Sequence, residues 1–182
     1  DLGCTAQDVR ITGIATVPGG PTSCVGGGSI TLDLDVTLNF AKPDRYDVGV
    51  FLASDGKDPA VTSPNSGAAS CSVSILPLTS PFLNLDADGC GDGNDTVGGT
   101  GVGVVRVTGV PVLCQSVALS GGKLYIPYLT SWDNTAGPGC TTAADPVPST
   151  SSKCNAPDST VEADVLRSTV GLVTLPTISK TD

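Results

Sequence analysis

Residues 29–40 read Ser-Ile-Thr-Leu-Asp-Leu-Asp-Val-Thr-Leu-Asn-Phe, and this stretch decides the fold class. Apolar and polar side chains alternate along it. The apolar positions of one side are Leu32, Leu34, Val36, Leu38 and Phe40. Because successive side chains of a β-strand point to opposite faces, this pattern predicts a long strand with one face on a core. Asp33 and Asp35 fall on the outer face, where they favour solubility and protect a sheet edge.

Other segments of the chain also show strand patterns, and no part of the sequence shows a convincing helical pattern. They are residues 8–17, 48–53, 71–78, 104–112, 117–119, 123–129 and, holding one or two strands, 160–178. About eight strands without helices predict an all-β fold. We expect a single β-sandwich with Greek-key, immunoglobulin-like connections, formed by one domain over residues 1–182.

The composition excludes several functions. The net charge is −9, which argues against nucleic acid as a partner because phosphates need basic patches. The chain has no histidine, so Ser-His-Asp and Cys-His mechanisms are impossible. Glu162 is the only glutamate among 18 acidic residues, and aspartate favours turns and metal sites over helices. These aspartates lie in glycine-rich turns, so an acid-pair hydrolase is disfavoured and no enzyme is expected.

A second stretch, residues 84–95, reads Asn-Leu-Asp-Ala-Asp-Gly-Cys-Gly-Asp-Gly-Asn-Asp and contains Asp86, Asp88, Asp92 and Asp95. Carboxylates this close repel one another unless a cation or solvent screens them. The glycines between them let the backbone curl, so that oxygens face one point. Calcium takes about six to eight oxygen ligands in flexible geometry, so the stretch predicts a calcium loop. A solvated acidic turn is the alternative.

The stretch matches an EF-hand loop only in part. Asp86 and Asp88 fit the first and third ligand positions, and Gly91 fits the sixth. Cys90 stands where another side-chain ligand is expected, and Val97 where the bidentate glutamate should be. We therefore expect a different calcium loop, which uses a backbone carbonyl from near Cys90 and borrows ligands from elsewhere.

Two aspartates outside the stretch are candidates for the borrowed ligands. Asp47 precedes an apolar strand; its other possible role is a capped turn or a bridge to Arg45. Asp133, with Asn134 and beside Trp132, lies in what is otherwise a plain turn. The predicted metal set is Asp47, Asp86, Asp88, Cys90, Asp92, Asp95 and Asp133.

Trp132, Tyr125 and Tyr128 lie close together in the sequence and raise the alternative of a sugar-stacking platform. Tyr125 and Trp132 are an odd number of residues apart, so regular alternation puts them on opposite faces of a strand. Core packing is therefore the better interpretation.

The cysteines stand singly, at positions 4, 24, 71, 90, 114, 140 and 154. No C-x-x-C pair occurs, so the pattern indicates disulfides formed in an oxidising compartment. Their odd number leaves at least one free or bonded to another chain. The long loop over 135–158 needs a staple, which a Cys140–Cys154 disulfide would supply. No apolar run approaches the ~20 residues that span a membrane. The sequence starts at Asp1-Leu2-Gly3-Cys4 without a signal peptide, so we expect a mature protein whose export signal has been removed.

The order of several motifs resembles a group of secreted bacterial domains. The motifs are residues 45–51, 53–56, 84–92, 126–128, 131–134 and 152–155, so the resemblance covers most of the chain, from about Cys4 to Asn155. Such domains look like cysteine-bridged, calcium-associated extracellular β-modules of surface proteins and extracellular fibres. The resemblance implies no enzymatic activity.

The resemblance also bears on the disulfides. Similar sequences often carry a further cysteine soon after the position of Cys114, about where Leu129 stands here. This implies that Cys114 is the odd thiol, that Cys71 pairs with Cys90, and that Cys140 pairs with Cys154. Cys4 and Cys24 would form the remaining pair. The extended strand between them spans roughly 30 Å, so an intersubunit bridge from either one is the alternative.

Together these features predict a structural subunit of an extracellular, calcium-stabilised filament or surface assembly. The alternative is a carbohydrate-binding or adhesion module of a surface protein. The expected partner is a second copy of the chain, joined by strand sharing, because an extended terminal segment can complete a neighbour's sheet. Residues 1–17 are the preferred donor, since Cys4 can lock the joint covalently, and residues 161–178 are the other candidate.

Overall fold

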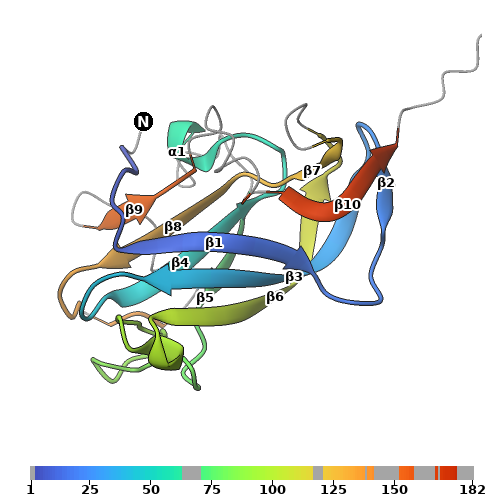
Figure 1. Cartoon of the computed structure of the whole chain (residues 1–182). Coiled ribbons are helices and arrows are strands. Elements are labelled where there is room, and N and C mark those ends of the chain that lie inside the picture. Colours follow the sequence, from blue (N-terminus) through green and yellow to red (C-terminus); the bar gives the residue numbers. More distant parts are fainter. Residues whose placement is uncertain are drawn as a thin grey trace, which may run out of the picture.

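The computed structural model describes residues 3–62, 71–116, 121–137, 139–141, 152–157, 167 and 169–175. Within these residues the regular structure is almost entirely β (Figure 1). The strands are β1 (Val9–Thr16), β2 (Ser23–Val25), β3 (Ser29–Phe40), β4 (Tyr46–Ala53), β5 (Cys71–Ile75), β6 (Val102–Leu113), β7 (Lys123–Tyr125), β8 (Tyr128–Asp133), β9 (Lys153–Asn155) and β10 (Thr169–Leu175). Two short helical turns accompany them, α1 (Pro59–Thr62) and η1 (Val97–Gly99). The predicted all-β class is confirmed.

β3 is the central strand of the first sheet, which has the order β1-β3-β6. Both neighbours are antiparallel to it; Val9 lies opposite Phe40, and Val36 lies opposite Val105. The five residues expected to face the core are each 2% exposed or less: Leu32, Leu34, Val36, Leu38 and Phe40. The alternation read from the sequence therefore gives the correct face of this strand.

The outer face of β3 is joined to β6 by its two aspartates. Asp35 accepts two hydrogen bonds from the guanidinium of Arg106, at 2.8 and 2.9 Å, and Arg106 holds the pKa of this carboxyl below its usual range. Asp33 accepts a hydrogen bond of 2.8 Å from the backbone N–H of Gly109. These two side chains thus hold the edge strand β6 against β3. This is a role in addition to the solubility that the sequence predicts for them.

The second sheet has the order β5-β4-β8-β9, and all its pairs are antiparallel. β4 is buried along nearly its whole length because both of its faces are covered. Val48, Val50 and Leu52 join the main core together with the inward side chains of β3 and β6. Phe51 points the other way, into a second cluster with Leu129 and the Cys4 and Cys154 side chains. This double burial explains the continuous apolar run of β4.

A third sheet, of order β2-β10-β7, makes the fold more divided than one two-sheet sandwich. β10 runs parallel to β2 and antiparallel to β7, so strands from distant parts of the chain lie side by side (Figure 1). Val170 and Leu172 of β10 are buried in the main core. The strand prediction missed β2 and β9, since runs of three residues are too short to show a pattern.

The described chain contains three disulfides, which confirms the expected stapling but not the expected pairs. The bonds are Cys4–Cys154, Cys24–Cys114 and Cys90–Cys140, and Cys71 is the free thiol. The predictions of Cys71–Cys90, Cys140–Cys154 and Cys4–Cys24, and of Cys114 as the odd thiol, are therefore wrong.

The reason is that backbone pairing brings together cysteines that are remote in the sequence. Backbone hydrogen bonds join residues 4–6 to β9 and to the residue that follows it. Ala6 N, for example, donates to Cys154 O at 3.1 Å. Cys114 N donates to Gly28 O at 2.7 Å, just beyond β2. Gly89 N donates to Cys140 O at 2.8 Å. Each hydrogen bond lies beside one disulfide, and none can be read from the spacing of the cysteines.

The two candidate donor segments are also placed in part. β1, inside residues 1–17, completes a sheet of its own chain and buries Val9, Ile11 and Ile14. β10 lies inside residues 161–178 and is likewise paired within the chain. Residues 1–2, 161–166, 168 and 176–178 of these segments lie outside the described residues, as do 117–119.

Candidate metal centre

The acidic stretch 84–95 forms a loop between β5 and η1 that returns beside β4. Isolated bridges pair Gly91 with Leu76, Asp92 with Leu83, and Gly93 with Arg45. The bridges place the aspartates of the stretch beside the start of β4, where Asp47 lies. The borrowing of a ligand from β4 that the sequence predicts is therefore geometrically feasible.

The glycines of the stretch serve close packing. A Cβ on Gly93 would lie 2.1 Å from Cε1 of Phe40, and one on Gly91 would lie 2.7 Å from Cβ of Leu76. Neither glycine has a positive φ. These glycines are therefore not needed for left-handed backbone; they let the loop lie directly on the core.

Asp92 is completely buried and acts as a brace between the loop and β4. Its Oδ1 accepts a hydrogen bond of 3.0 Å from the backbone N–H of Asp47, and its Oδ2 accepts one of 2.5 Å from Leu85 N. Burial raises the pKa of Asp92, while these two backbone donors oppose the rise. Each oxygen accepts one backbone hydrogen bond, so Asp92 links the loop to the start of β4.

Asp47 is buried as well, at 7% exposure, and more deeply than Asp86 and Asp88. Its φ of 53° lies in the left-handed region, which aspartate tolerates better than most residues. Its Oδ1 is buried and has no hydrogen-bond partner among the described residues. One carboxylate oxygen each from Asp47, Asp86 and Asp88 lie within 4.8 Å of one another. The fold thus brings three acidic side chains to one point.

Asp86 and Asp88 differ in how much of their hydrogen-bonding capacity is used. Both oxygens of Asp86 are buried without a partner in the described chain. Asp88 Oδ1 accepts a hydrogen bond of 2.9 Å from Cys90 N, and its Oδ2 accepts one from Cys140 N. Asn84 clamps the turn with two 3.2 Å bonds to the backbone of Asp88. Buried acceptors without donors are costly, and a cation beside Asp86 and Asp47 would offset that cost.

The pKa values of the group also indicate that positive charge is lacking beside these carboxylates. Burial, and then the charges of Asp88, Asp86 and Asp92, raise the pKa of Asp47 to about 7. Burial and the Asp88 carboxylate also raise the pKa of Asp86. Both shifts mean that the folded chain disfavours the charged forms in the absence of a cation.

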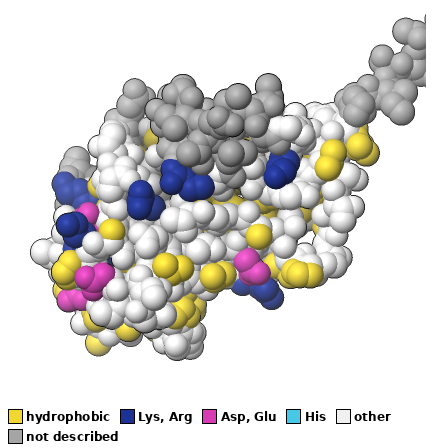
Figure 2. All heavy atoms as spheres, in the orientation of Figure 1, with side chains coloured by type: hydrophobic (Ala, Val, Ile, Leu, Met, Phe, Trp, Pro, Cys, Tyr) yellow, Lys and Arg dark blue, Asp and Glu magenta, His cyan; other side chains and the backbone are white. Residues whose placement is uncertain are grey.

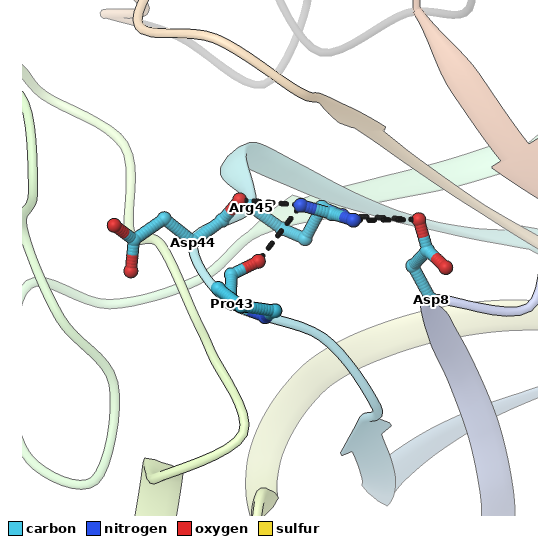
Figure 3. A network of polar contacts seen from close by, with 4 residues as sticks. All are labelled: Asp8, Pro43, Asp44 and Arg45. Carbon is cyan, nitrogen blue, oxygen red and sulfur yellow. Dashed lines mark hydrogen bonds and ion pairs between the residues drawn. The ribbon is translucent and has the colours of Figure 1, made fainter.

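Arg45 does not supply the missing charge. Its Nη2 and Nε donate to Asp8 Oδ2 at 2.8 and 3.1 Å, and its Nη1 donates to the carbonyls of Pro43 and Asp44 at 2.7 Å each (Figure 3). The alternative role of Asp47 as a bridge to Arg45 is therefore wrong. The Asp8–Arg45 pair, which joins β1 to the start of β4, was not foreseen from the sequence.

Cys90, Asp95 and Asp133 are not members of the group formed by the three aspartates. Cys90 is bonded to Cys140, so its sulfur is no thiolate ligand. Asp95 is exposed and is not in the group; its backbone N–H donates to Lys42 O at 3.1 Å. Asp133 ends β8 opposite Tyr46, and its Oδ1 is buried without a partner among the described residues.

The three gathered aspartates offer only carboxylate oxygens, the donor type that calcium and magnesium prefer. A catalytic arrangement with histidine or thiolate is impossible in this donor set. The aromatic residues weighed as a sugar platform are buried, with Trp132 and Tyr128 at 1% exposure and Tyr125 at 9%. They pack in the interior, as the odd spacing indicated.

No protein-family description matches the chain, and a search of curated proteins finds no relative. In the part of the chain that the structure describes, no helix has the length and apolar character needed to cross a membrane.

Proposed function

We propose that this protein is a calcium-binding structural subunit of an extracellular filament or surface assembly. The observation that carries the proposal is the convergence of Asp47, Asp86 and Asp88, with buried oxygens on Asp47 and Asp86 that lack a partner in the described chain. Calcium would offset the repulsion of these carboxylates. It would also tie the acidic loop to β4.

Three disulfides support an extracellular location, because such bonds form and persist in oxidising compartments. A structural role outside the cell is also consistent with two other features of the chain. Its aspartates are gathered in loops, and its aromatic side chains are mostly buried.

Self-association is supported by the exposed apolar side chains of the small third sheet. Val25, Val173 and Leu175 are 54%, 52% and 45% exposed, and Leu175 lies opposite Val25 in the β2–β10 register. On the face shown in Figure 2, hydrophobic side chains otherwise lie in small separate groups. We expect a second copy of the chain to cover this sheet, and strand sharing through a terminal segment to form the joint.

Calorimetry and electron microscopy with calcium test the two halves of the proposal. Asp47→Asn keeps the shape and the tolerance of positive φ but removes a ligand charge. We expect it to abolish the tightest calcium site and to raise the melting temperature of the calcium-free protein, because one repelling carboxylate is gone. Asp95→Asn is the control, and it should bind calcium like the unaltered protein.

The assembly itself is tested by imaging the native material with calcium and after addition of a chelator. We expect ordered filaments or sheets with calcium and their loss with the chelator. Unchanged calcium binding in Asp47→Asn would move the metal site elsewhere. Discrete monomers at all protein concentrations, with calcium bound, would contradict the assembly alone.

A further inference from the structure

The segment that follows β8 lies beside Asp47 and Asp88, although it is remote from the acidic stretch in sequence. At its start, Asp133 is opposite Tyr46, next to Asp47. At its end, Cys140 is bonded to Cys90 and donates its backbone N–H to the Asp88 carboxylate. Residues 133–137 and 139–141 therefore contact the candidate centre at Asp47 and at Asp88.

Gly137 brings the backbone of this segment against two carboxylates. A Cβ at this position would lie 3.2 Å from Oδ2 of Asp47 and 3.8 Å from Oδ2 of Asp133. The first distance is tighter than an ordinary van der Waals contact. The backbone of Asp47 is held by the buried Asp92 carboxylate, which accepts a hydrogen bond from its N–H, so the adjustment would fall on the Asp47 side chain. A Cβ on residue 137 would therefore press on the Asp47 carboxylate and shift it by a few tenths of an ångström.

Asp133, like Asp47 and Asp86, has a buried carboxylate oxygen without a donor or positive charge beside it in the described part of the chain. Its Oδ1 is buried and has no hydrogen-bond partner in the described part of the chain. The ion pairs found among the described residues are Arg45–Asp8, Lys57–Asp55 and Arg106–Asp35, so none of them neutralises this region. A cation between the acidic loop and the segment would offset charges on both sides.

We propose that the cation bound by Asp47, Asp86 and Asp88 also binds Asp133 and holds residues 133–137 against the site, with Gly137 as the positioning residue. This inference rests on the proposed calcium site and adds a fourth carboxylate to it. The ion then joins three parts of the chain: the start of β4, the acidic loop and the end of β8. The Cys90–Cys140 disulfide fastens two of the same parts covalently.

Calorimetric titration of calcium into Asp133→Asn and Gly137→Ala tests the inference. We expect affinity to fall about 10- to 100-fold in each, as is typical when groups that orient metal ligands are altered. Gly171→Ala is the matched control, because a Cβ there meets nothing within 4 Å, and its affinity should be unchanged. Melting temperatures in chelator show that each variant is folded.

The result separates this inference from the calcium site itself. If Asp133→Asn and Gly137→Ala bind calcium normally while Asp47→Asn does not, the three-aspartate site stands and the fourth ligand is wrong. If Asp47→Asn also binds normally, the site as a whole is wrong.

Hydrogen exchange gives a second readout that does not depend on affinity. With calcium bound, we expect slower amide exchange in residues 133–137 of the unaltered protein and a smaller effect in Gly137→Ala. Protection confined to residues 84–92 would overturn the proposed hold on residues 133–137.

Discussion

At the scale of single residues, Asp47 holds an uncommon conformation for a purpose. A positive φ in a non-glycine residue is strained and persists only where neighbours over-determine it. Here the Asp92 carboxylate fixes the backbone N–H, and β4 continues directly from this residue. The result is a carboxylate aimed at Asp86 and Asp88 from outside the acidic stretch.

The sequence indicates some of these residue roles and cannot indicate others. Asp86 and Asp88 follow from local spacing, and the sequence also makes Asp47 a candidate for a distant ligand. Asp92 and Asp95 look alike in the sequence, yet one is buried as a brace and the other exposed. That difference arises from the bridge between Asp92 and Leu83, which is a tertiary contact. Calcium binding by the gathered residues stays a prediction.

Cys71 gives a prediction at this scale. Burial, with a smaller effect of the Asp55 charge, raises the pKa of its thiol from 9.0 to about 11. Because the thiolate is the reactive form, its fraction at pH 8 is about 100-fold smaller than for an ordinary thiol. We expect iodoacetamide to alkylate Cys71 at least that much more slowly in the native protein than in urea with the disulfides intact. Equal rates in the two states would contradict this assignment, and a rise in the native rate toward pH 11 would support it.

At the scale of elements, the acidic loop behaves as part of the core. Its glycines lie on Phe40 and Leu76, and its bridges continue the edges of the neighbouring strands. The loop is therefore expected to keep its shape with or without a cation, and the cation to act mainly on its side chains and on the segment beside them. The sequence identified the loop but not this packing, because the contacting residues lie far away in the chain.

Gly93→Ala tests the packing of the loop. The added Cβ would meet the Phe40 ring at 2.1 Å, so we expect a loss of about 1–3 kcal/mol in the free energy of unfolding. Urea titration measures this loss, with Gly171→Ala as the control, which should change stability by only about 1 kcal/mol through strand propensity. Equal midpoints for the two variants would show that the loop is not pressed against the core.

At the scale of the whole molecule, the alternation of β3 and the apolar run of β4 were sufficient to predict an all-β fold. They were not sufficient to predict three sheets or the disulfide pairs. Those depend on which strands become neighbours, and the parallel pair of β2 and β10 joins residues 23–25 to 173–175. Local patterns describe faces of strands, whereas partners are chosen by the packing of the complete chain.

The proposed strand sharing makes a prediction for the whole assembly. β1 is followed by a Pro-Gly-Gly-Pro turn, from which it can open and fill the same place in a neighbouring copy. Cys4 would then bond to Cys154 of that neighbour, instead of to the Cys154 of its own chain as in the single subunit. We expect assembled material to give a ladder of covalent oligomers on a gel without reductant. Cys4→Ser should remove the ladder and leave Cys24–Cys114 and Cys90–Cys140 in peptide maps.

Assembled material that runs entirely as monomers without reductant would show that residues 1–17 are not the donor. The segment 161–178 would then be the remaining terminal candidate.

The position of β10 has a consequence for the order of events during biosynthesis. β10 lies between β2 and β7, so neither of these short strands has its sheet partner until residue 175 has left the ribosome. The core positions filled by Val170 and Leu172 are likewise empty until then. Pairings between such distant segments form slowly, because a long loop must close first. The sheet β2-β10-β7 therefore cannot form before β10 has been synthesised, and until then this part of the chain stays unfolded enough to pass through a pore.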